Sequence, residues 1–339
     1  MKQRGSGLNL STKKTRKREF SEEMERVGPW DVLVQIVESH YPKAKTGRPP
    51  FAIETMRRIH CLQQWFALSD PAMEEALHDM PVFREFAKLD GAVRLPDETT
   101  ILRFRHLLEK HDLAVDMLRE VNDILQAKGL QMNNGTVVDA SLIAAPSSTK
   151  NADGERDPEM KQTKKGNQWY FGMKAHIGVD AESGLVHSVI GTSANVNDVT
   201  QAGGLLHGEE EIALGDAGYR GVHRREEAHG PQWHVAMRAS DRRKLNPFIG
   251  AEYAAEQFEK LKASVRARGE HPFRVLKRQF GYTKVRCRGL VKGTAQNPTP
   301  RPAPACGLVG PRLQRAAGSA TAGETAACPR ADSSAGSVV

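Results

Sequence analysis

The sequence predicts an α+β protein, in which an all-helical domain precedes a mixed β-sheet flanked by helices. Helical spacing dominates from about residue 30 to 130, whereas strand-like segments separated by turns follow from about residue 134. A helical pattern returns in NPFIGAEYAAEQFEKLKASVRAR, after the last strand. Helices that precede and follow a run of strands indicate a sheet with helices packed on it.

Composition narrows the class of protein. The chain has 339 residues, enough for two domains, and a net charge of +8 with clusters such as KKTRKR. Such clusters favour a polyanionic partner. There is neither an apolar run of membrane-spanning length nor a signal peptide, so we expect a cytoplasmic protein. The four cysteines have no CxxC spacing, so neither a zinc site nor a disulfide framework is predicted.

The first domain is expected to be helical. Residues 1–29 are polar, basic and contain Gly and Ser, which predicts a flexible arm before it. Within residues 30–130, SDPAMEEAL begins with a helix cap at Ser69 or Asp70, and Asp97 caps ETTILRFRHLLEKHDL.

In the second of these helices an apolar stripe lies opposite Arg103 and Arg105. Two interpretations stay open for the domain: a helix-turn-helix that binds DNA, or an all-helical packing module. We assign the DNA contact to the region around Arg103 and Arg105.

Two aspartates lie in or at the ends of predicted strands. Asp139 follows an apolar run in VVDASLI, and Asp216 does the same in IALGDAGY. Each alone fits a turn at the end of a strand. Together with a glutamate from a later helix they would form a group of carboxylates, which cannot all ionise in a dry site without cations. Oxygen ligands of this kind suit magnesium or manganese.

Glu270 is the candidate third carboxylate, because it stands alone among bases in RARGEHPFRVLKRQ. On a continuous helix Arg266, Glu270, Arg274 and Lys277 share one face, which suits a site where bases hold phosphate. An ordinary solvated ion pair is the alternative. Pro272 predicts a break or kink between Gly269 and Pro272.

These motifs resemble DDE transposases of the insertion-sequence-five type, in the wider group with insertion-sequence-four elements. The resemblance runs from about residue 45 to 296, through LSDPAMEEALHD, LPDETTILRFRHLLEKH, VVDASLI, GDAGYRG and EHPFRVLKRQFGYTKVRCRGL. It implies a ribonuclease-H-like catalytic domain over residues 131–296 and a helical DNA-binding and dimerisation domain over residues 30–130.

The resemblance also implies the chemistry. Asp139, Asp216 and Glu270 would hold two Mg²⁺ or Mn²⁺ ions, cut DNA at the inverted-repeat ends of an insertion sequence and join the 3′-hydroxyl ends to target DNA. Arg266, Arg274 and Lys277 would hold DNA, and paired ends imply a homodimer. Two alternatives remain: an inactive end-binding repressor, and a stand-alone nuclease on the same fold.

The chain departs from the family pattern at three places. Ala263 occupies the tyrosine position of the Y-x2-R-x3-E-x6-K signature, and Gly269 replaces an aliphatic residue. After Gln296 the resemblance stops, and residues 297–339 are dominated by Ala, Pro, Gly, Ser and Arg. This composition predicts either a disordered tail or, as we favour, a gene read out of frame, which translation of the locus in its other two frames would test.

Other side chains have competing roles. His176, His187 and His223 lie near the acids in sequence, but without metal-ligand spacing they are predicted to be structural. Trp169 and Tyr170 are assigned to core packing at the start of a strand, with stacking on a flipped base as the alternative.

Overall fold

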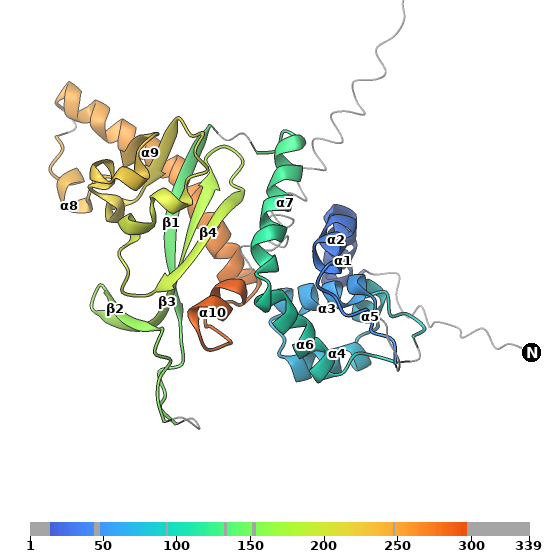
Figure 1. Ribbon diagram of the computed structural model, residues 1–339. Coiled ribbons are helices and arrows are strands. Elements are labelled where there is room, and N and C mark those ends of the chain that lie inside the picture. The colour runs from blue at the N-terminus through green and yellow to red at the C-terminus, as the bar shows by residue number, and fades with distance from the viewer. Residues whose placement is uncertain are drawn as a thin grey trace, which may run out of the picture.

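The computed structural model describes residues 14–43, 48–92, 94–131, 134–150, 154–246 and 248–296. In these ranges the chain forms a helical region followed by a sheet with helices, as predicted (Figure 1). The change from helix to strand falls between Ala127 and Gly135. The tail of residues 297–339, with its expected disorder or shifted frame, lies outside the described residues.

The helical region packs around one central helix. Its members are α1 (Arg16–Val27), α2 (Trp30–Glu38), α3 (Ile53–Trp65), α4 (Asp70–Asp79), α5 (Pro81–Phe86), α6 (Glu98–Lys110) and α7 (Leu113–Ala127). Every residue of α3 from Thr55 to Trp65 is buried. Its Arg58 pairs with Glu54 and Glu25 and lies 4.2 Å from the ring centre of Trp30, so a buried cation has both charge and aromatic partners.

The predicted caps start α4 and α6. The Ser69 hydroxyl accepts the backbone N–H of Ala72 at 3.3 Å, and the Asp97 carboxylate accepts that of Thr100 at 2.8 Å. The expected arm over residues 1–29 is wrong for residues 16–27, which form α1. Residues 1–13 are outside the described ranges. Thr15 caps α1 and Met24 is buried, because the helix covers the aromatic core with one apolar face.

The sheet contains strands β1 (Gly135–Ala144), β2 (Lys161–Lys165), β3 (Gln168–Asp180), β4 (Val186–Ser193), β5 (Ile212–Gly215) and β6 (Gln232–Val235). Strands β4, β3 and β1 are antiparallel neighbours, whereas β5 and β6 continue the sheet parallel to β1. Strand β2 pairs with the first half of β3, and the two form a hairpin. This mixed order, with three meandering strands and then two parallel ones, is the expected ribonuclease-H-like arrangement.

Both faces of the sheet are covered. Alternation along β1 sends Val137 to the core that includes Phe273 and Leu276, and Val138 to the core that includes Val199 and Tyr219. The second core is built by short 3₁₀ turns, at Asp198–Gln201, Gly203–Leu205, Ala217–Tyr219, Val222–Arg224 and Glu226–Ala228.

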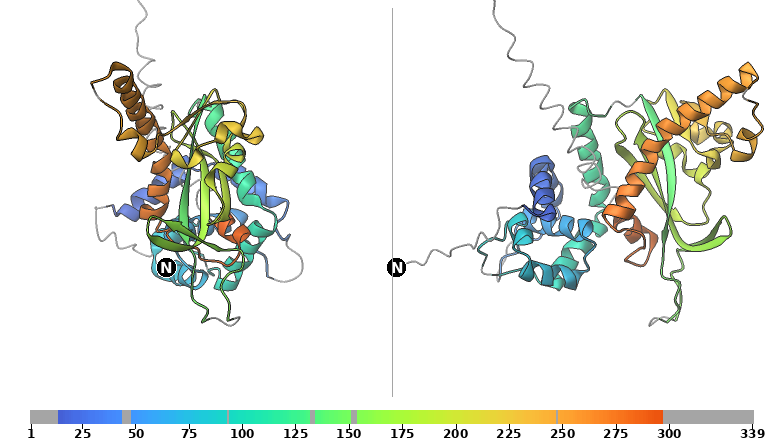
Figure 2. Two further views of the ribbon diagram at one scale, coloured as in Figure 1. Left: turned by 90° about the vertical axis from the view of Figure 1, so that its left-hand side faces the viewer. Right: turned by 180° about the vertical axis from the view of Figure 1, so that it is seen from behind.

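Helices follow the last strand. They are the short α8 (Ala239–Arg242), the long α9 (Gly250–Arg274), a π-helical turn (Val275–Gln279) and α10 (Leu290–Gln296). Figure 2 shows α9 crossing the sheet while its first half projects beyond it. Among the described helices, none is both long and apolar enough to cross a bilayer.

Candidate active site

Parallel pairing of β1 with β5 places Asp139 and Asp216 at the same height in the sheet. Val137 of β1 pairs with Leu214 of β5, so Asp139 and Asp216 each lie two residues beyond a shared rung. Asp139 lies on the same side of β1 as Val137, which faces α9. Asp216 ends its strand by accepting the backbone N–H of Gly218 at 2.8 Å.

The third carboxylate comes from α9. A Cβ atom on Gly269 would lie 2.8 Å from Cγ1 of Val137 and 3.7 Å from Cβ of Asp139. The missing side chain at Gly269 therefore lets the helix approach β1 closely, right beside Glu270. The departure from the family pattern at Gly269 has this structural reason. Glu270 itself is exposed.

A break or a kink was expected near Gly269 to Pro272, and the break is wrong. Helix α9 runs unbroken from Gly250 to Arg274 with Pro272 buried inside it. The irregularity comes one turn later, where Val275–Gln279 forms a π-helical turn. A proline removes one backbone donor, and a widened turn nearby is a known way to accommodate such a defect.

Electrostatics couple the three acids. Burial raises the pKa of Asp139 to about 6, and the negative charges of Asp216 and Glu270 contribute to the rise. The backbone N–H of Ala140 and the Arg266 guanidinium oppose it. The charges of Asp216, Glu270 and Arg266 therefore all act on the Asp139 carboxylate. Such a shift marks a carboxylate that lacks a counter-charge of sufficient strength.

The basic side chains around the acids differ in exposure. Lys277 donates from Nζ to Oγ of Ser141 at 2.6 Å and to the carbonyl oxygen of Leu142 at 2.8 Å, both on β1. Burial and nearby Lys165 lower the pKa of Lys277, while Asp139 raises it. Arg266 is half-buried, and Arg274 and Ala263 are exposed. Lys277 thus lies between the acids and the β2–β3 hairpin.

The sequence patterns did not predict a second set of charged side chains, Lys174 and Asp198, beside the acids. Lys174 donates to Oδ1 of Asp198 at 2.9 Å and to the carbonyl oxygen of Val196 at 2.7 Å. A Cβ atom on Gly218 would lie 2.8 Å from Oδ1 of Asp216 and 3.6 Å from Oδ2 of Asp198, so Asp198 is close to Asp216. Asp198 lies in the irregular segment NVNDVTQ, where no periodicity predicts its direction.

Tyr219 lies beneath these carboxylates. Its side chain is 1% exposed, and within the described part of the chain its hydroxyl has no hydrogen-bond partner. Burial raises its pKa, and the charges of Asp198, Asp139 and Asp216 add to the rise. The motif GDAGYRG contains this tyrosine, but only the fold brings it close enough for the charges of these carboxylates to act on it.

Donor chemistry suits a divalent cation at this place. Asp139, Asp216 and Glu270 offer carboxylate oxygens, and burial, with the charges of Asp216 and Glu270, raises the pKa of Asp139. Throughout the described residues, however, no three His, Cys, Asp or Glu side chains are gathered closely enough to hold a metal ion. The residues fit the ion by chemistry and region, while their side chains are not drawn together.

The predicted DNA contact on α6 needs a correction. Arg105 is 12% exposed and pairs with Asp70 at 2.7 Å and Glu109 at 3.2 Å. It therefore ties α6 to the start of α4, and its role as a DNA contact is not tenable because its guanidinium is used internally. Arg103 is exposed.

Core packing is also the wrong role for Trp169. Its side chain is 64% exposed on β3, directly across from Lys164 of β2. Tyr170 is half-buried and donates its hydroxyl to the Gln168 side chain at 2.9 Å. Trp169 therefore faces outward at the end of the hairpin, whereas Phe171 of the same strand packs against the core that includes Met160 and Met173.

The histidines are structural, as predicted, where the structure shows their partners. His176 is fully buried and bonded to Oγ1 of Thr192 at 2.8 Å, and burial lowers its pKa to about 4. His187 bonds Oγ1 of Thr136 and Oγ of Ser188 at 3.1 and 2.9 Å, and burial likewise lowers its pKa to about 4. Both ring nitrogens of His187 are therefore bonded, whereas Nδ1 of His176 is buried without a hydrogen-bond partner among the described residues.

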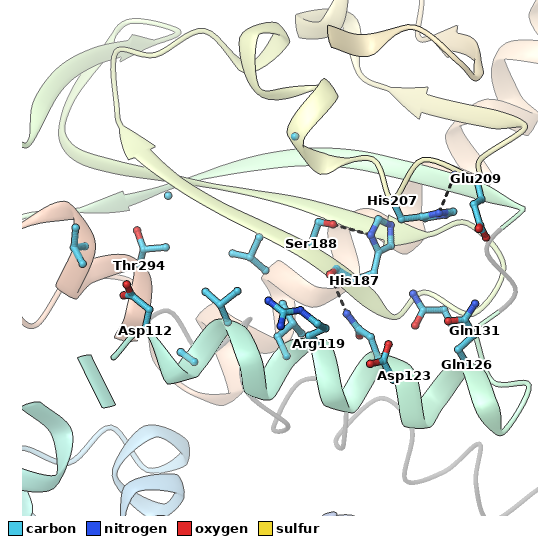
Figure 3. A pocket seen from close by; sticks show the side chains of 18 of the residues that line it. Asp112, Arg119, Asp123, Gln126, Gln131, His187, Ser188, His207, Glu209 and Thr294 are labelled. Carbon is cyan, nitrogen blue, oxygen red and sulfur yellow. Dashed lines mark hydrogen bonds between the residues drawn. The ribbon is translucent and has the colours of Figure 1, made fainter. Parts of the chain in front are cut away.

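His187 also lines a groove away from the acids. Figure 3 shows this groove between α7 and β4. Asn122 of α7 donates to the carbonyl oxygen of His187 at 2.9 Å. The volume of the groove is about 760 Å³, and residues of α10 such as Thr294 close one end. Asp139, Asp216 and Glu270 are not among its lining residues, so this groove is separate from the acidic site.

Two family models match this chain. A transposase DDE domain matches residues 131–297, and a transposase domain (DUF772) matches residues 9–107. Similar solved structures include a cryo-EM piggyBac transposase synaptic complex with hairpin DNA, at 10% identity and a TM-score of 0.43 over 88% of this chain and 74% of that one. Another is the Mos1 strand transfer complex, at 12% identity and a TM-score of 0.18 over 87% of this chain and 97% of that one.

Enzymes with a DDE domain act on DNA in transposition and typically use divalent metal ions. The match to this domain spans the strands and the helix that carry Asp139, Asp216 and Glu270. The chain therefore carries a transposase N-terminal domain followed by a transposase DDE domain, the catalytic domain of an enzyme family that cleaves and joins DNA strands.

Proposed function

We propose that this protein is a transposase of the insertion-sequence-five type that cuts DNA at the inverted-repeat ends of its element. Hydrolysis at an end frees a 3′-hydroxyl group, which then attacks a phosphodiester bond of target DNA. One observation carries the proposal. The close approach of α9 to β1 adds Glu270 to the side of Asp139, where Asp216 on the neighbouring strand already acts on the same carboxylate.

Asp139, Asp216 and Glu270 would hold two divalent cations, magnesium or manganese. When bound, such ions lower the pKa of a nucleophilic hydroxyl and stabilise the charge on a departing oxygen. The protein's own contribution is to hold Asp139 and Asp216 on neighbouring strands and Glu270 on the helix that packs against them. Asp139 must also lose its proton, because a carboxylic acid is a poor ligand.

The DNA would lie along the basic side chains around this site. Arg266 and Lys277 are near the acids, and exposed Arg274 extends the same surface. Phosphate contacts of this kind position a strand without reading its sequence. The helical domain, including exposed Arg103, would bind the inverted repeats in a cytoplasmic homodimer that pairs two ends. The out-of-frame origin of residues 297–339 belongs to the same proposal.

An end-binding repressor is the second candidate, favoured by one observation. No group of three ligands is gathered for a metal ion in the described parts of the chain. In a protein that binds ends without cleaving them, the carboxylates would stay apart with cations and DNA bound. In an enzyme, the carboxylates would move together when cations and DNA bind.

A strand-transfer assay with paired ends of the element, in magnesium or manganese, tests the proposal. Asp139→Asn and Glu270→Gln are expected to abolish cleavage while leaving end binding within about twofold, because each removes a ligand charge and keeps the side-chain shape. Asp116→Asn, on the surface of α7, is the matched control and should cleave normally.

Cleavage by either site variant would remove that residue from the site. End binding without cleavage by the unmodified chain would favour the repressor, and cutting of DNA without repeat ends a stand-alone nuclease.

A further inference from the structure

Tyr219 buries a hydroxyl group that has no hydrogen-bond partner in the described ranges of the chain. Its side chain is 1% exposed and packs among apolar residues such as Val138 and Val199. A buried hydroxyl without a partner keeps its full desolvation cost, whereas a phenylalanine would fill almost the same volume without that cost. Such a group calls for an explanation, and its partner has to come from the side chains around it.

The ring of Tyr219 lies against the end of β5, directly before Asp216. A Cβ atom on Gly215 would lie 3.0 Å from Cβ, Cγ and Cδ2 of Tyr219, so the missing side chain of this glycine leaves room for the ring. The backbone N–H of Tyr219 donates to the carbonyl oxygen of Asp216 at 3.0 Å, and that of Gly218 donates to Oδ1 of Asp216 at 2.8 Å. Asp216 and Tyr219 therefore belong to one short turn.

Asp198 borders the same turn from a distant segment of the chain. A Cβ atom on Gly218 would lie 2.8 Å from Oδ1 of Asp216 and 3.6 Å from Oδ2 of Asp198. Lys174 fixes Asp198 by donating to its Oδ1 at 2.9 Å, and it donates to the carbonyl oxygen of Val196 at 2.7 Å. The Lys174 side chain is only 14% exposed, so solvent screens this ion pair less than a surface pair.

These contacts leave Asp216 as the acceptor for the Tyr219 hydroxyl. Oδ1 of Asp198 already has the Lys174 ammonium as its partner, whereas Asp216 accepts a backbone N–H from within its own turn. Burial raises the pKa of the Tyr219 hydroxyl, and the charges of Asp198, Asp139 and Asp216 add to the rise, so the hydroxyl keeps its proton and can donate it. Repulsion between Asp198 and Asp216 disfavours rotation of the Asp216 carboxylate toward Asp198.

We propose that Lys174, Asp198 and Tyr219 are positioning residues for Asp216, and that the Tyr219 hydroxyl donates to the Asp216 carboxylate when a divalent cation is bound. The inference rests on the proposed function, because the three residues have this task only if Asp216 holds a cation. Within the described residues the acids are not gathered closely enough for a metal ion, so cation binding requires a carboxylate to move. A donor that orients a ligand oxygen raises its affinity for the metal.

A pair of buried tyrosines tests the hydroxyl. Tyr219 and Tyr282 are each 1% exposed, but the Tyr282 hydroxyl donates to the carbonyl oxygen of Gly293 at 3.2 Å. In a chelator, Tyr282→Phe should lower the midpoint of thermal unfolding, whereas Tyr219→Phe should not, because it removes no hydrogen bond. Tyr219→Phe should instead raise the manganese dissociation constant of the full chain about tenfold, and Tyr282→Phe should leave it unchanged. Electron paramagnetic resonance of the free manganese ion measures this constant without DNA.

Charge variants separate positioning from general electrostatics. Asp198→Asn should weaken manganese binding about tenfold, and its combination with Tyr219→Phe by less than about a hundredfold, because both act on one carboxylate. Asp116→Asn is the matched control, since Asp116 also pairs with a base, at 3.2 Å, and it should bind manganese normally. Lys174→Met is the sharpest variant. Loss of a positive charge would by itself strengthen cation binding, whereas the proposed positioning predicts weaker binding.

The outcomes distinguish this inference from the proposed function. Unchanged manganese binding in Tyr219→Phe, stronger binding in Lys174→Met, or a loss of stability of Tyr219→Phe in the chelator would each overturn the positioning, and leave DNA cleavage by this chain an independent question. No manganese binding by the unmodified chain, with or without DNA of an element end, would overturn both. In a cleavage assay, Tyr219→Phe should regain activity at high manganese, whereas Asp139→Asn should not.

Discussion

Single side chains decide what the acidic site can do, and Asp139 is the first of them. Its raised pKa means that the folded protein binds this proton more tightly than the unfolded chain does, against an ordinary value of 3.8. The metal-free protein therefore keeps the associated stability below about pH 4 and loses it as the pH rises through about 6. The loss amounts to about 3 kcal/mol, at roughly 1.4 kcal/mol per pKa unit.

Asp139→Asn removes this titration. In a chelator, we expect the variant to be more stable than the unmodified protein near neutral pH by about 2 to 3 kcal/mol, and about equal to it near pH 4. Urea unfolding at the two pH values measures the difference. Added manganese should stabilise the unmodified protein and not the variant. Identical pH dependence in both proteins would show that Asp139 is not the titrating carboxylate.

Gly269 is the second decisive position. Gly269→Ala would place a methyl group 2.8 Å from Cγ1 of Val137, a stiff β-branched side chain in the core. We expect a net cost of about 1 to 2 kcal/mol in urea unfolding, because overpacking exceeds the gain in helix propensity. Val137→Ala in the same chain should restore part of that stability by making room. A neutral or stabilising Gly269→Ala would contradict the close approach of α9 to β1.

Among the elements, α9 joins three tasks that the sequence presents as separate motifs. It buries an ion pair against β6, brings Glu270 to β1, and through the following π-helical turn sends Lys277 to Ser141. Because one rigid helix carries all three, its distance from β1 controls the whole site.

The β2–β3 hairpin is the element best suited to contact DNA strands near the acids. It has the sequence KQTKKGNQWYFG, with three lysines and no acid, and its Trp169 is 64% exposed. Trp169→Ala should weaken binding to element ends about tenfold, since one base stacked on an aromatic ring contributes about 1 to 3 kcal/mol. Fluorescence anisotropy measures this.

Trp169→Phe is the control for the hairpin, because phenylalanine keeps a stacking face and should retain most of the affinity. The midpoint of thermal unfolding should not change in either variant, since the side chain has no core beneath it. Unaltered affinity of Trp169→Ala, or a loss of stability, would show that the hairpin does not stack on DNA.

For the molecule as a whole, the net charge of +8 predicts binding that depends on salt. We expect the affinity for an end fragment to fall by about a thousandfold between about 50 and 200 mM salt, through release of counterions from phosphate. Arg266→Ala and Arg274→Ala should each reduce the slope of log affinity against log salt by about one. Asp139→Asn should not reduce it. Equal slopes for all variants would remove these arginines from the DNA path.

Local patterns were sufficient to predict many elements of this protein. The caps at Ser69 and Asp97, the order of helices and strands, and the placement of Asp139 and Asp216 at strand positions follow from spacing and turn chemistry. Such features depend on residues a few positions apart, which is why periodicity reveals them. Trp169 on the hairpin shows the limit, because an aromatic residue in a strand reads as core whether or not a core lies beneath it.

Contacts between distant segments were settled by the folded chain alone. The internal ion pairs of Arg105, the position of Asp198 beside Asp216, and the exposure of Phe258 on α9 join residues far apart in sequence or depend on which helix face is covered. Amino-acid order therefore determined which side chains could bind metal and DNA. Packing decided which of them are free to do so, because a charge is available to a ligand only where no partner within the protein already satisfies it.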